Sequence, residues 1–310
     1  MFRLPGDRKS QLRLGLVVVL VLLFAAGVWG VARYFDQLSR NAELREAVVG
    51  NDIEKAKQLL AAGASADGRI QLGNRGFGSD NRYRPLIHAI DQRNDAMVRL
   101  LVEEGAELYF GEPEYYESAV RWALYHCNRS AAEFFVHEVS AFDIQREDVD
   151  ELLRLSAECG YLELVEYWIE HGAAAAGATN RTGLFLGTPL NEAVMGGHRA
   201  VAQVLIERGA PVNAVSSGYP RGTPLAVACD QGRPELVDLL LEMGADPNQL
   251  SRGTLPLHHA IWSDNLEAIR LLLAAGADPT LVDADGDSAR AVAQREGKAE
   301  IIQMFARSER

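Results

Sequence analysis

The chain has 310 residues, of which 48% are hydrophobic and 24% are charged, and this composition excludes a mostly disordered or collagen-like protein. Its 31 basic and 43 acidic residues give a net charge of −12, which argues against nucleic acid as a partner because phosphate binding needs a surplus of lysine and arginine. Three cysteines are too few for a fold built on disulfides.

The N-terminal segment differs in charge from the rest of the chain. Residues 1–40 hold six basic and two acidic residues, whereas the remainder holds 25 basic and 41 acidic residues. Residues 14–32, from Leu14 to Ala32, form a run of nineteen residues without a charge. As a helix this run would be about 28 Å long, close to the hydrocarbon thickness of a bilayer. The sequence therefore predicts a basic segment at 1–13, a transmembrane helix at 14–32 and a juxtamembrane linker at 33–40.

Two alternatives for this segment stay open. A cleaved signal peptide has an apolar run of about 7–15 residues, shorter than the one seen here, and a helix buried in a core is the other possibility. Four basic residues precede the run and only Arg33 and Arg40 follow it closely, so the positive-inside rule places the N-terminus in the cytoplasm. Arginine outnumbers lysine 27 to 4, as is typical of GC-rich genomes. We therefore expect a single-pass protein of a bacterial inner membrane with its body in the periplasm.

The body of the chain is repetitive. Similar stretches begin at Gly187, Gly222 and Thr254, and each leads into an apolar helix that closes with Gly-Ala. The turn that precedes each closing glycine by twelve residues serves as a marker, and a small residue stands four positions before it in all eight repeats. The marker residues are Asn51, Arg93, Cys127, Gly160, Gly197, Gly232, Asp264 and Gly297, with spacings of 42, 34, 33, 37, 35, 32 and 33 residues.

This pattern resembles the ankyrin repeat, whose Thr-Pro-Leu-His-x-Ala and Gly-Ala-Asp/Asn signatures recur here. The resemblance implies an all-α solenoid of seven or eight helix-turn-helix units with hairpin loops over residues 41–308. In such a unit the threonine caps the first helix, the proline fits its first turn, and the closing glycine ends the second helix with a positive φ. Repeats one, three and four depart from the signature, since Val139-Ser140 replaces one Gly-Ala and Glu151-Leu152 replaces one Thr-Pro.

The sequence predicts neither enzyme activity nor a cofactor. It contains no Gly-x-Ser-x-Gly, His-Glu-x-x-His or phosphate-loop motif. The segment 283–288 resembles a calcium loop, but its glycine is fourth rather than sixth. A cluster of histidines and cysteines in repeats three and four lacks the close pairs of zinc sites, although a metal-linked or thiol-linked function is kept as an alternative. The cluster contains His126, Cys127, His137, Cys159 and His171.

A disulfide between Cys127 and Cys159 is an open hypothesis. Both residues lie at the same end of adjacent repeats. Stacked helices are about 8–10 Å apart, which exceeds the Cα separation of about 7 Å that a disulfide tolerates, so closing the bridge would require some shift. Cys229 follows a small-residue position and is expected in the core.

Two insertions are the best indication of a binding surface. The first repeat spacing exceeds 33 by nine residues, at 67–83, and a further excess lies between Gly172 and Gly187. Insertions of this kind form loops on one face, often the binding face, and aromatic and arginine side chains are typical interface anchors. The alternative is that these aromatic side chains pack down onto the stack. The candidate partner-binding residues are Arg75, Phe77, Tyr83, Tyr115, Tyr116, Phe185, Tyr219 and Arg221.

The predicted function is a membrane-anchored, non-catalytic scaffold for protein–protein interaction. Its concave face and hairpin fingers would hold a protein partner, and the acidic body favours a partner with a basic patch. No small-molecule substrate is predicted. A soluble, exported repeat protein released by signal cleavage is an alternative.

Overall fold

A computed structural model describes residues 33–68, 84–110, 117–139, 142–144, 148–177 and 187–308. The predicted transmembrane segment and the candidate residues Arg75, Phe77, Tyr83, Tyr115, Tyr116 and Phe185 lie outside these ranges. The chain divides into two compact units, Met1–Trp122 and Ala123–Arg310, here called the N-terminal and C-terminal units.

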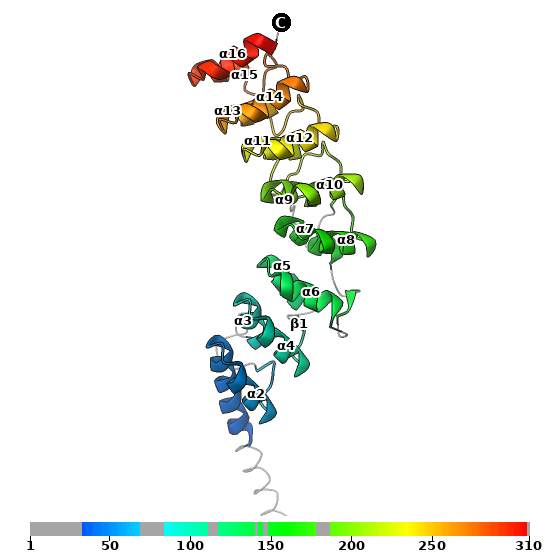
Figure 1. Cartoon of the computed structure of the whole chain (residues 1–310), viewed down its shortest axis with the longest axis vertical. Coiled ribbons are helices and arrows are strands. Elements are labelled where there is room, and N and C mark those ends of the chain that lie inside the picture. Colours follow the sequence, from blue (N-terminus) through cyan, green and yellow to red (C-terminus); the bar gives the residue numbers. More distant parts are fainter. Residues whose placement is uncertain are drawn as a thin grey trace, which may run out of the picture. The chain divides into compact units, whose positions relative to one another are not determined.

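The N-terminal unit contains helix pairs and one short hairpin (Figure 1). Its first described helix covers residues 33–49 and therefore includes the segment that was predicted to be a linker. Strands β1 and β2 pair antiparallel, with Tyr109 opposite Ser118. The further elements are α2 (Ile53–Ala61), α3 (Pro85–Asp91), α4 (Asp95–Glu103), β1 (Tyr109–Phe110) and β2 (Glu117–Ser118), and α5 (Ala119–Tyr125) crosses into the C-terminal unit.

The C-terminal unit is a stack of helix pairs (Figure 1). First helices contact first helices of the next repeat, and second helices contact second helices, so two helical layers result. Its elements are α6 (Arg129–His137), α7 (Val149–Cys159), α8 (Leu162–Glu170), α9 (Pro189–Gly196), α10 (Arg199–Glu207), α11 (Pro224–Asp230), α12 (Pro234–Glu242), α13 (Pro256–Trp262), α14 (Leu266–Ala274), α15 (Ala289–Arg295) and α16 (Ala299–Ser308).

The turns that join the two helices of each repeat confirm the register derived from the sequence. All eight marker residues have a positive φ, between 46° at Cys127 and 82° at Gly197. Four of them are not glycine, and these residue types adopt the left-handed region at a cost. The closing glycines are left-handed as well, for example Gly209 at 97° and Gly244 at 90°. Six of the eight repeats therefore have two left-handed turns each, one at the marker and one at the closing glycine.

The helix starts also follow the expected chemistry. Thr188 and Thr223 precede α9 and α11, and each side chain accepts a hydrogen bond from the backbone N–H three residues later. Ser288 does the same for α15. Because an uncapped helix start leaves backbone donors without partners, these side chains favour the observed starts of α9, α11 and α15.

The small-residue column is buried in both units. The eight side chains are at most 2% exposed, as expected where first helices approach one another. They are Ala47, Ala89, Ala123, Ser156, Ala193, Ala228, Ala260 and Ala293.

Ser156, the one polar member of this column, has a specific partner. Its hydroxyl accepts a hydrogen bond of 2.9 Å from the indole N–H of Trp168, and both side chains are fully buried. We expect Ser156→Ala to lower the free energy of unfolding by about 1–3 kcal/mol, because the indole N–H would be left buried without an acceptor. Urea unfolding of Ser156→Ala, Trp168→Phe and the double variant tests this. A double variant that costs as much as the two single changes together would show that the two side chains are not coupled.

The predicted membrane localisation is not borne out by the described part of the chain. Within the described ranges, no helix is long and apolar enough to cross a membrane. The helix over residues 33–49 is the nearest to the predicted span, but it carries Arg33, Asp36, Arg40, Glu43, Arg45 and Glu46. Charged side chains of this kind are costly in hydrocarbon.

Candidate functional site

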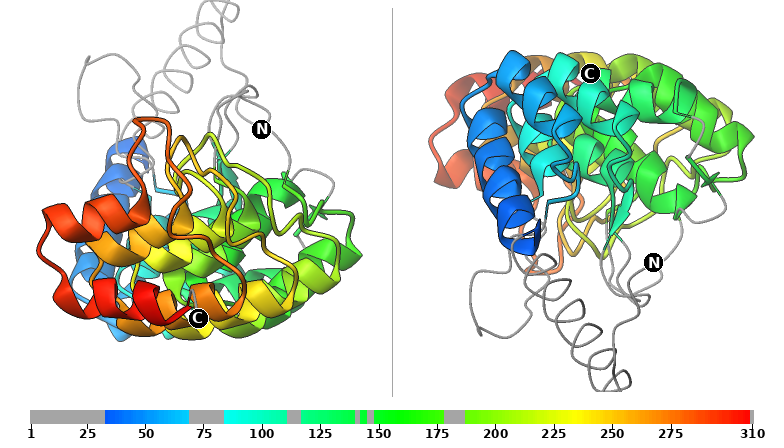
Figure 2. Two further views of the ribbon diagram at one scale, coloured as in Figure 1. Left: turned by 90° about the horizontal axis from the view of Figure 1, so that it is seen from above. Right: turned by 90° about the horizontal axis from the view of Figure 1, so that it is seen from below.

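The C-terminal unit has two different faces. Hairpin loops project past the layer of first helices and away from the second helices (Figure 2). Three of these loops, here called the fingers, comprise residues 211–222, 246–254 and 278–288. The first helices and the fingers together are called the finger side.

Exposed apolar side chains gather on the finger side. Seven large hydrophobic side chains are exposed in the described part of the C-terminal unit, and none of them belongs to a second helix. Because isolated exposed hydrophobic residues are common but clustered ones mark interaction sites, this asymmetry identifies the finger side as the candidate site. The seven are Tyr125, Val215, Tyr219, Leu250, Trp262, Leu281 and Val282.

Two of the sequence-predicted site residues, Tyr219 and Arg221, lie on the first finger and both are exposed, Tyr219 to 69%. Asn191, fully buried on α9, donates from its side-chain amide to the backbone oxygens of Pro220 and Gly222 at 3.1 and 2.9 Å. The buried Asn191 amide therefore holds the backbone of the finger against α9, while the Tyr219 side chain is exposed to solvent.

A glycine permits this close approach of finger and stack. A Cβ at Gly187 would lie 2.3 Å from the backbone oxygen of Tyr219, which is closer than such atoms can come. Gly187 thus lies against the first finger at a point where a side chain would not fit.

Sequence reasoning missed Tyr125 and Trp262. They end α5 and α13, two positions before their marker residues, and are 70% and 48% exposed. The Trp262 ring packs edge-on against His259, whose imidazole lies 3.6 Å from the Asp230 carboxylate. The sequence could have indicated that both side chains are exposed, because the same register position in repeat six is occupied by a charged residue, Asp230, which is exposed.

One aromatic residue near the candidate residues Tyr115 and Tyr116 is buried. Phe110, a few positions before them in the sequence, is 2% exposed. The guanidinium of the buried Arg84 lies 4.9 Å from the centre of its ring. For Phe110 the packing alternative is therefore correct.

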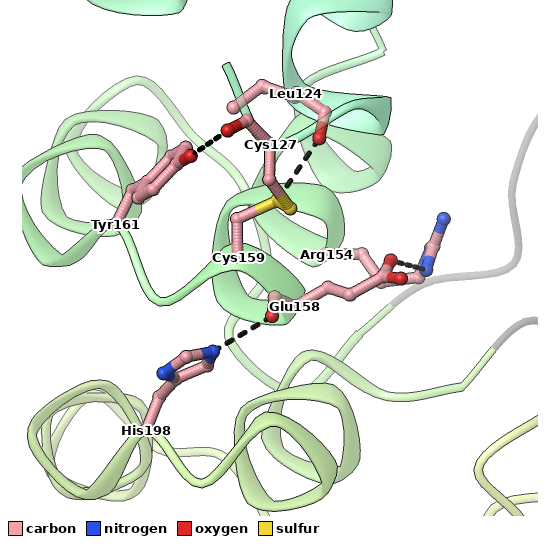
Figure 3. The surroundings of a disulfide bond; sticks show 7 residues. All are labelled: Leu124, Cys127, Arg154, Glu158, Cys159, Tyr161 and His198. Carbon is pink, nitrogen blue, oxygen red and sulfur yellow. Dashed lines mark hydrogen bonds and ion pairs between the residues drawn. A yellow bond between two sulfur atoms is a disulfide. The ribbon is translucent and has the colours of Figure 1, made fainter. Parts of the chain in front are cut away.

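Cys127 and Cys159 form a disulfide, with a Cα separation of 5.5 Å (Figure 3). The helix spacing had indicated a larger gap. That spacing applies to helix axes, whereas Cys127 lies in the turn after α5 and Cys159 is the last residue of α7. The Cα atoms of residues in or beside turns can be closer together than the helix axes are, so the disulfide can form.

Polar contacts surround the disulfide (Figure 3). The Tyr161 hydroxyl donates to the backbone oxygen of Cys127 at 2.5 Å. The Cys159 sulfur lies 3.1 Å from the Leu124 backbone oxygen. A disulfide sulfur carries no proton, so this is a packing contact that only a reduced thiol could turn into a hydrogen bond.

One repeat further along, a histidine makes the corresponding link. The His198 ring Nε2 lies 3.0 Å from the Glu158 backbone oxygen (Figure 3), and since a carbonyl only accepts, this nitrogen carries the proton. A Cβ at Gly160 would lie 2.4 Å from the same ring. The glycine at this marker therefore suits the left-handed turn and leaves room for the approach of His198.

The histidines and cysteines of repeats three and four do not come together as a metal site. Cys127 and Cys159 are bonded to each other, and the described ranges contain no group of three potential ligands that could hold a metal ion. His137 and His171 instead contact the Tyr167 ring, at centroid distances of 5.4 and 4.0 Å.

A charged cluster lies between α7 and α9. The Arg154 guanidinium is within 2.7 Å of Glu192, 3.3 Å of Glu158 and 3.4 Å of Glu151. Burial raises the pKa of Glu192 from 4.5 to about 7, against the opposing effect of Arg154. These four described side chains comprise one cation and three carboxyl groups, so protonation of Glu192 relieves repulsion among the carboxyl groups.

Comparison with known proteins agrees with the register. A family model for ankyrin repeats, three copies long, matches residues 152–251 and 212–283. The chain contains ankyrin repeats. The matched segment includes the first two fingers and part of the third, so these fingers belong to ankyrin repeats.

A curated relative supports the same conclusion. The chain is 43% identical over 142 residues to BCL-6 corepressor-like protein 1 of Homo sapiens. The alignment covers 46% of this chain and 6% of the human protein, so the chain spans a small part of that relative's length. The similarity supports ankyrin repeats and not the activity of the whole human protein, and a human relative gives no support to the expected bacterial origin.

Proposed function

We propose that this chain is a non-catalytic scaffold that holds a protein partner on the finger side of its ankyrin repeats. The observation that carries the proposal is the confinement of exposed large hydrophobic side chains to this face within the described part of the C-terminal unit. Tyrosine and tryptophan are the residue types that most often dominate binding energy, and Tyr219 and Trp262 are among the exposed residues.

The proposal extends to the loops suggested by the sequence. Arg75, Phe77, Tyr83, Tyr115, Tyr116 and Phe185 remain predictions as partner contacts. Arg221 is exposed next to Tyr219 on the first finger and would extend the same contact surface. A partner with a basic patch fits the acidic chain, whose net charge is −12, because complementary charge accelerates encounter.

Affinity capture with the tagged full chain tests the proposal. We expect Tyr219→Ser combined with Trp262→Ser to reduce recovery of a specific partner at least about tenfold, as for the loss of central interface anchors. Both side chains are exposed, so the thermal melt should stay unchanged.

Arg270→Ala with Glu267→Ala is the matched control, because this exposed ion pair lies on α14, a second helix. Recovery that is equal for wild type and the Tyr219/Trp262 variant would reject the proposal. So would an equal loss in the Arg270/Glu267 control.

A further inference from the structure

Three side chains form a cluster at the C-terminal ends of α11 and α13, two first helices that pack against each other. Asp230 is the last residue of α11 and Trp262 is the last residue of α13. His259 contacts both: its Nδ1 lies 3.6 Å from an Asp230 carboxylate oxygen, and its ring is edge-on to the Trp262 indole, with the centroids 5.6 Å apart. The Asp230 side chain is 58% exposed and that of His259 only 20%. The cluster therefore presents a carboxylate and an indole to solvent beside one imidazole.

The Asp230 carboxylate is not balanced by a cation. Within the described ranges, His259 is the one basic side chain within 4.0 Å of this carboxylate, and its Nδ1 is too distant for a hydrogen bond. Burial lowers the pKa of His259 below 6.5, so the imidazole is neutral at pH 7. The carboxylate therefore keeps its full negative charge.

Two basic side chains of the neighbouring turns are directed to other oxygens. Arg233, three residues after Asp230, reaches the Met195 backbone oxygen in the preceding repeat at 3.4 Å. Lys298, in repeat eight, pairs with the Asp264 carboxylate at 2.9 Å. The Asp230 carboxylate thus stays available to a cation from outside the chain.

The position of Asp230 at a helix end is unfavourable for the fold. A helix C-terminus carries a partial negative charge, which repels a carboxylate and attracts a cation. The corresponding residues of the N-terminal unit satisfy one another: Asp91 ends α3, and the Trp122 indole N–H donates to its carboxylate at 2.7 Å. Trp122 and His259 share a register position, five residues before their markers. In repeats six and seven the carboxylate is kept without this hydrogen bond, which favours a role in binding over one in stability.

The combination of a carboxylate and an indole selects a cationic ligand. An apolar side chain that covered the indole would also remove water from the neighbouring carboxylate, which costs free energy unless the charge is paired. An anion would be repelled. A cation gains from both groups, because it pairs with the carboxylate and is attracted by the indole ring. A guanidinium suits both contacts better than an ammonium ion, since its plane stacks on aromatic rings, its edge donates to carboxylates, and it is less strongly hydrated.

We propose that Asp230 and Trp262 bind the guanidinium of an arginine side chain of the partner protein. The carboxylate accepts hydrogen bonds from the guanidinium, the indole packs against its plane, and His259 is a positioning residue that supports the indole ring. The inference rests on the proposed scaffold function and specifies one side chain of the basic partner and the place where it binds.

A nuclear magnetic resonance titration of the isotope-labelled full chain tests this. The probe is acetyl-Gly-Arg-Gly-amide. One comparator carries citrulline, which has the shape of arginine without its charge, and the other carries lysine. The readouts are the indole N–H signal of Trp262, assigned with Trp262→Phe, and the backbone amide signals of α11 and α13. We expect the arginine peptide to bind about tenfold more tightly than the citrulline peptide, as for the joint loss of an ion pair and a cation–π contact, and more tightly than the lysine peptide.

Variants separate binding from stability. Asp230→Asn and Trp262→Leu should each weaken binding of the arginine peptide at least about threefold. Asp230→Asn should leave the thermal melt unchanged or raise it, because it removes a carboxylate from a helix C-terminus. Asp91→Asn is the matched control, since Asp91 has the same register position and already accepts the Trp122 N–H, and it should bind the peptide as the wild type does.

Several results would overturn the inference. Among them are equal binding of the arginine peptide and either comparator, signals that do not shift, and binding that survives in Asp230→Asn. A lower melting temperature of Asp230→Asn would assign the carboxylate to the fold instead. If the Tyr219/Trp262 variant loses its captured partner while Asp230→Asn keeps it and the peptides bind alike, the inference fails and the scaffold function stands. If neither variant loses the partner, both fail.

Discussion

Replacing Cys127 and Cys159 by serine is expected to lower the free energy of unfolding by about 2–4 kcal/mol. The two residues are 32 positions apart, so the bond closes a long loop and restricts the unfolded chain. Denaturant unfolding of the oxidised wild type, the reduced wild type and the double variant measures the effect. The latter two should agree, since both lack the bond and serine retains the size of the thiol.

The single variants are the matched controls for this result. Cys127→Ser and Cys159→Ser should each cost about as much as the double change, because either one removes the same bond. Thiol titration of the unfolded, unreduced chain should find one free thiol, that of Cys229, which is buried in the folded protein. Three free thiols, or equal stability with and without reductant, would contradict the bridge.

The position of the disulfide determines which helices should be destabilised when it is reduced. In a repeat protein each unit contacts only its neighbours. The disulfide joins the turn after α5 to the end of α7, and the Arg129 guanidinium adds an ion pair of 2.6 Å with Glu163 between α6 and α8. Hydrogen exchange after reduction should therefore rise first in α6 and least in α13 to α16.

The repeat register could be predicted from the sequence because it depends on local rules. Left-handed turns, capping hydroxyl groups and small residues at helix contacts each leave a fixed residue type at a fixed spacing. Even non-glycine markers such as Asn51 and Asp264 proved left-handed, with φ of 58° and 55°. Their position in the repeat was more informative than their own conformational preference.

Distances between repeats were harder to predict. The separation of Cys127 and Cys159 was misjudged because helix-axis spacing says little about residues in turns. Asn191 stands at the position that His258 occupies in repeat seven. A polar residue at this buried position in both repeats indicates a structural hydrogen bond. Asn191 donates to backbone oxygens of the following finger, and His258 contacts the Asp287 backbone oxygen at 3.1 Å. Both residues therefore tie a first helix to the next finger by different side chains.

The exposed apolar residues of the finger side could not be found from helix pattern alone. A first helix of seven residues such as α13 completes only about two turns, so its pattern cannot separate buried from exposed positions. Trp262 reads as a core residue by type and is 48% exposed in the structure. Knowing which face carries the fingers was needed to interpret it.

Removing the Arg154 guanidinium is expected to destabilise the protein strongly, and more so at alkaline pH. Arg154→Met leaves the buried Glu192 carboxyl group without the guanidinium that lies 2.7 Å from it, at a cost of about 3–5 kcal/mol near pH 8. At pH 5 the cost should be smaller, because Glu192, with its pKa raised to about 7 by burial, is already protonated in the wild type. Urea unfolding at the two pH values measures the difference.

Glu192 also gives the wild type a pH dependence of defined sign. Its pKa is raised on folding from 4.5 to about 7, so the folded protein holds a proton that the unfolded chain releases. The corresponding stability is present below pH 4.5 and is lost as the pH rises to 7, by up to about 3 kcal/mol. Glu192→Gln should remove this part of the pH dependence. If the free energy of unfolding of Glu192→Gln changed between pH 5 and 7 as steeply as that of the wild type, or more steeply, the assignment would be contradicted.

The double variant separates the loss of a charge pair from the loss of packing. Arg154→Met combined with Glu192→Gln removes the cation and the carboxyl group that lies closest to it, at 2.7 Å. Replacing both members of a buried pair is often close to neutral, whereas removing one leaves an uncompensated charge. We therefore expect the double variant to recover most of the stability that Arg154→Met loses at pH 8, and to gain little at pH 5. A double variant as unstable as Arg154→Met at both pH values would mean that the arginine acts through the packing of its aliphatic stem, and that the carboxyl groups tolerate burial without it.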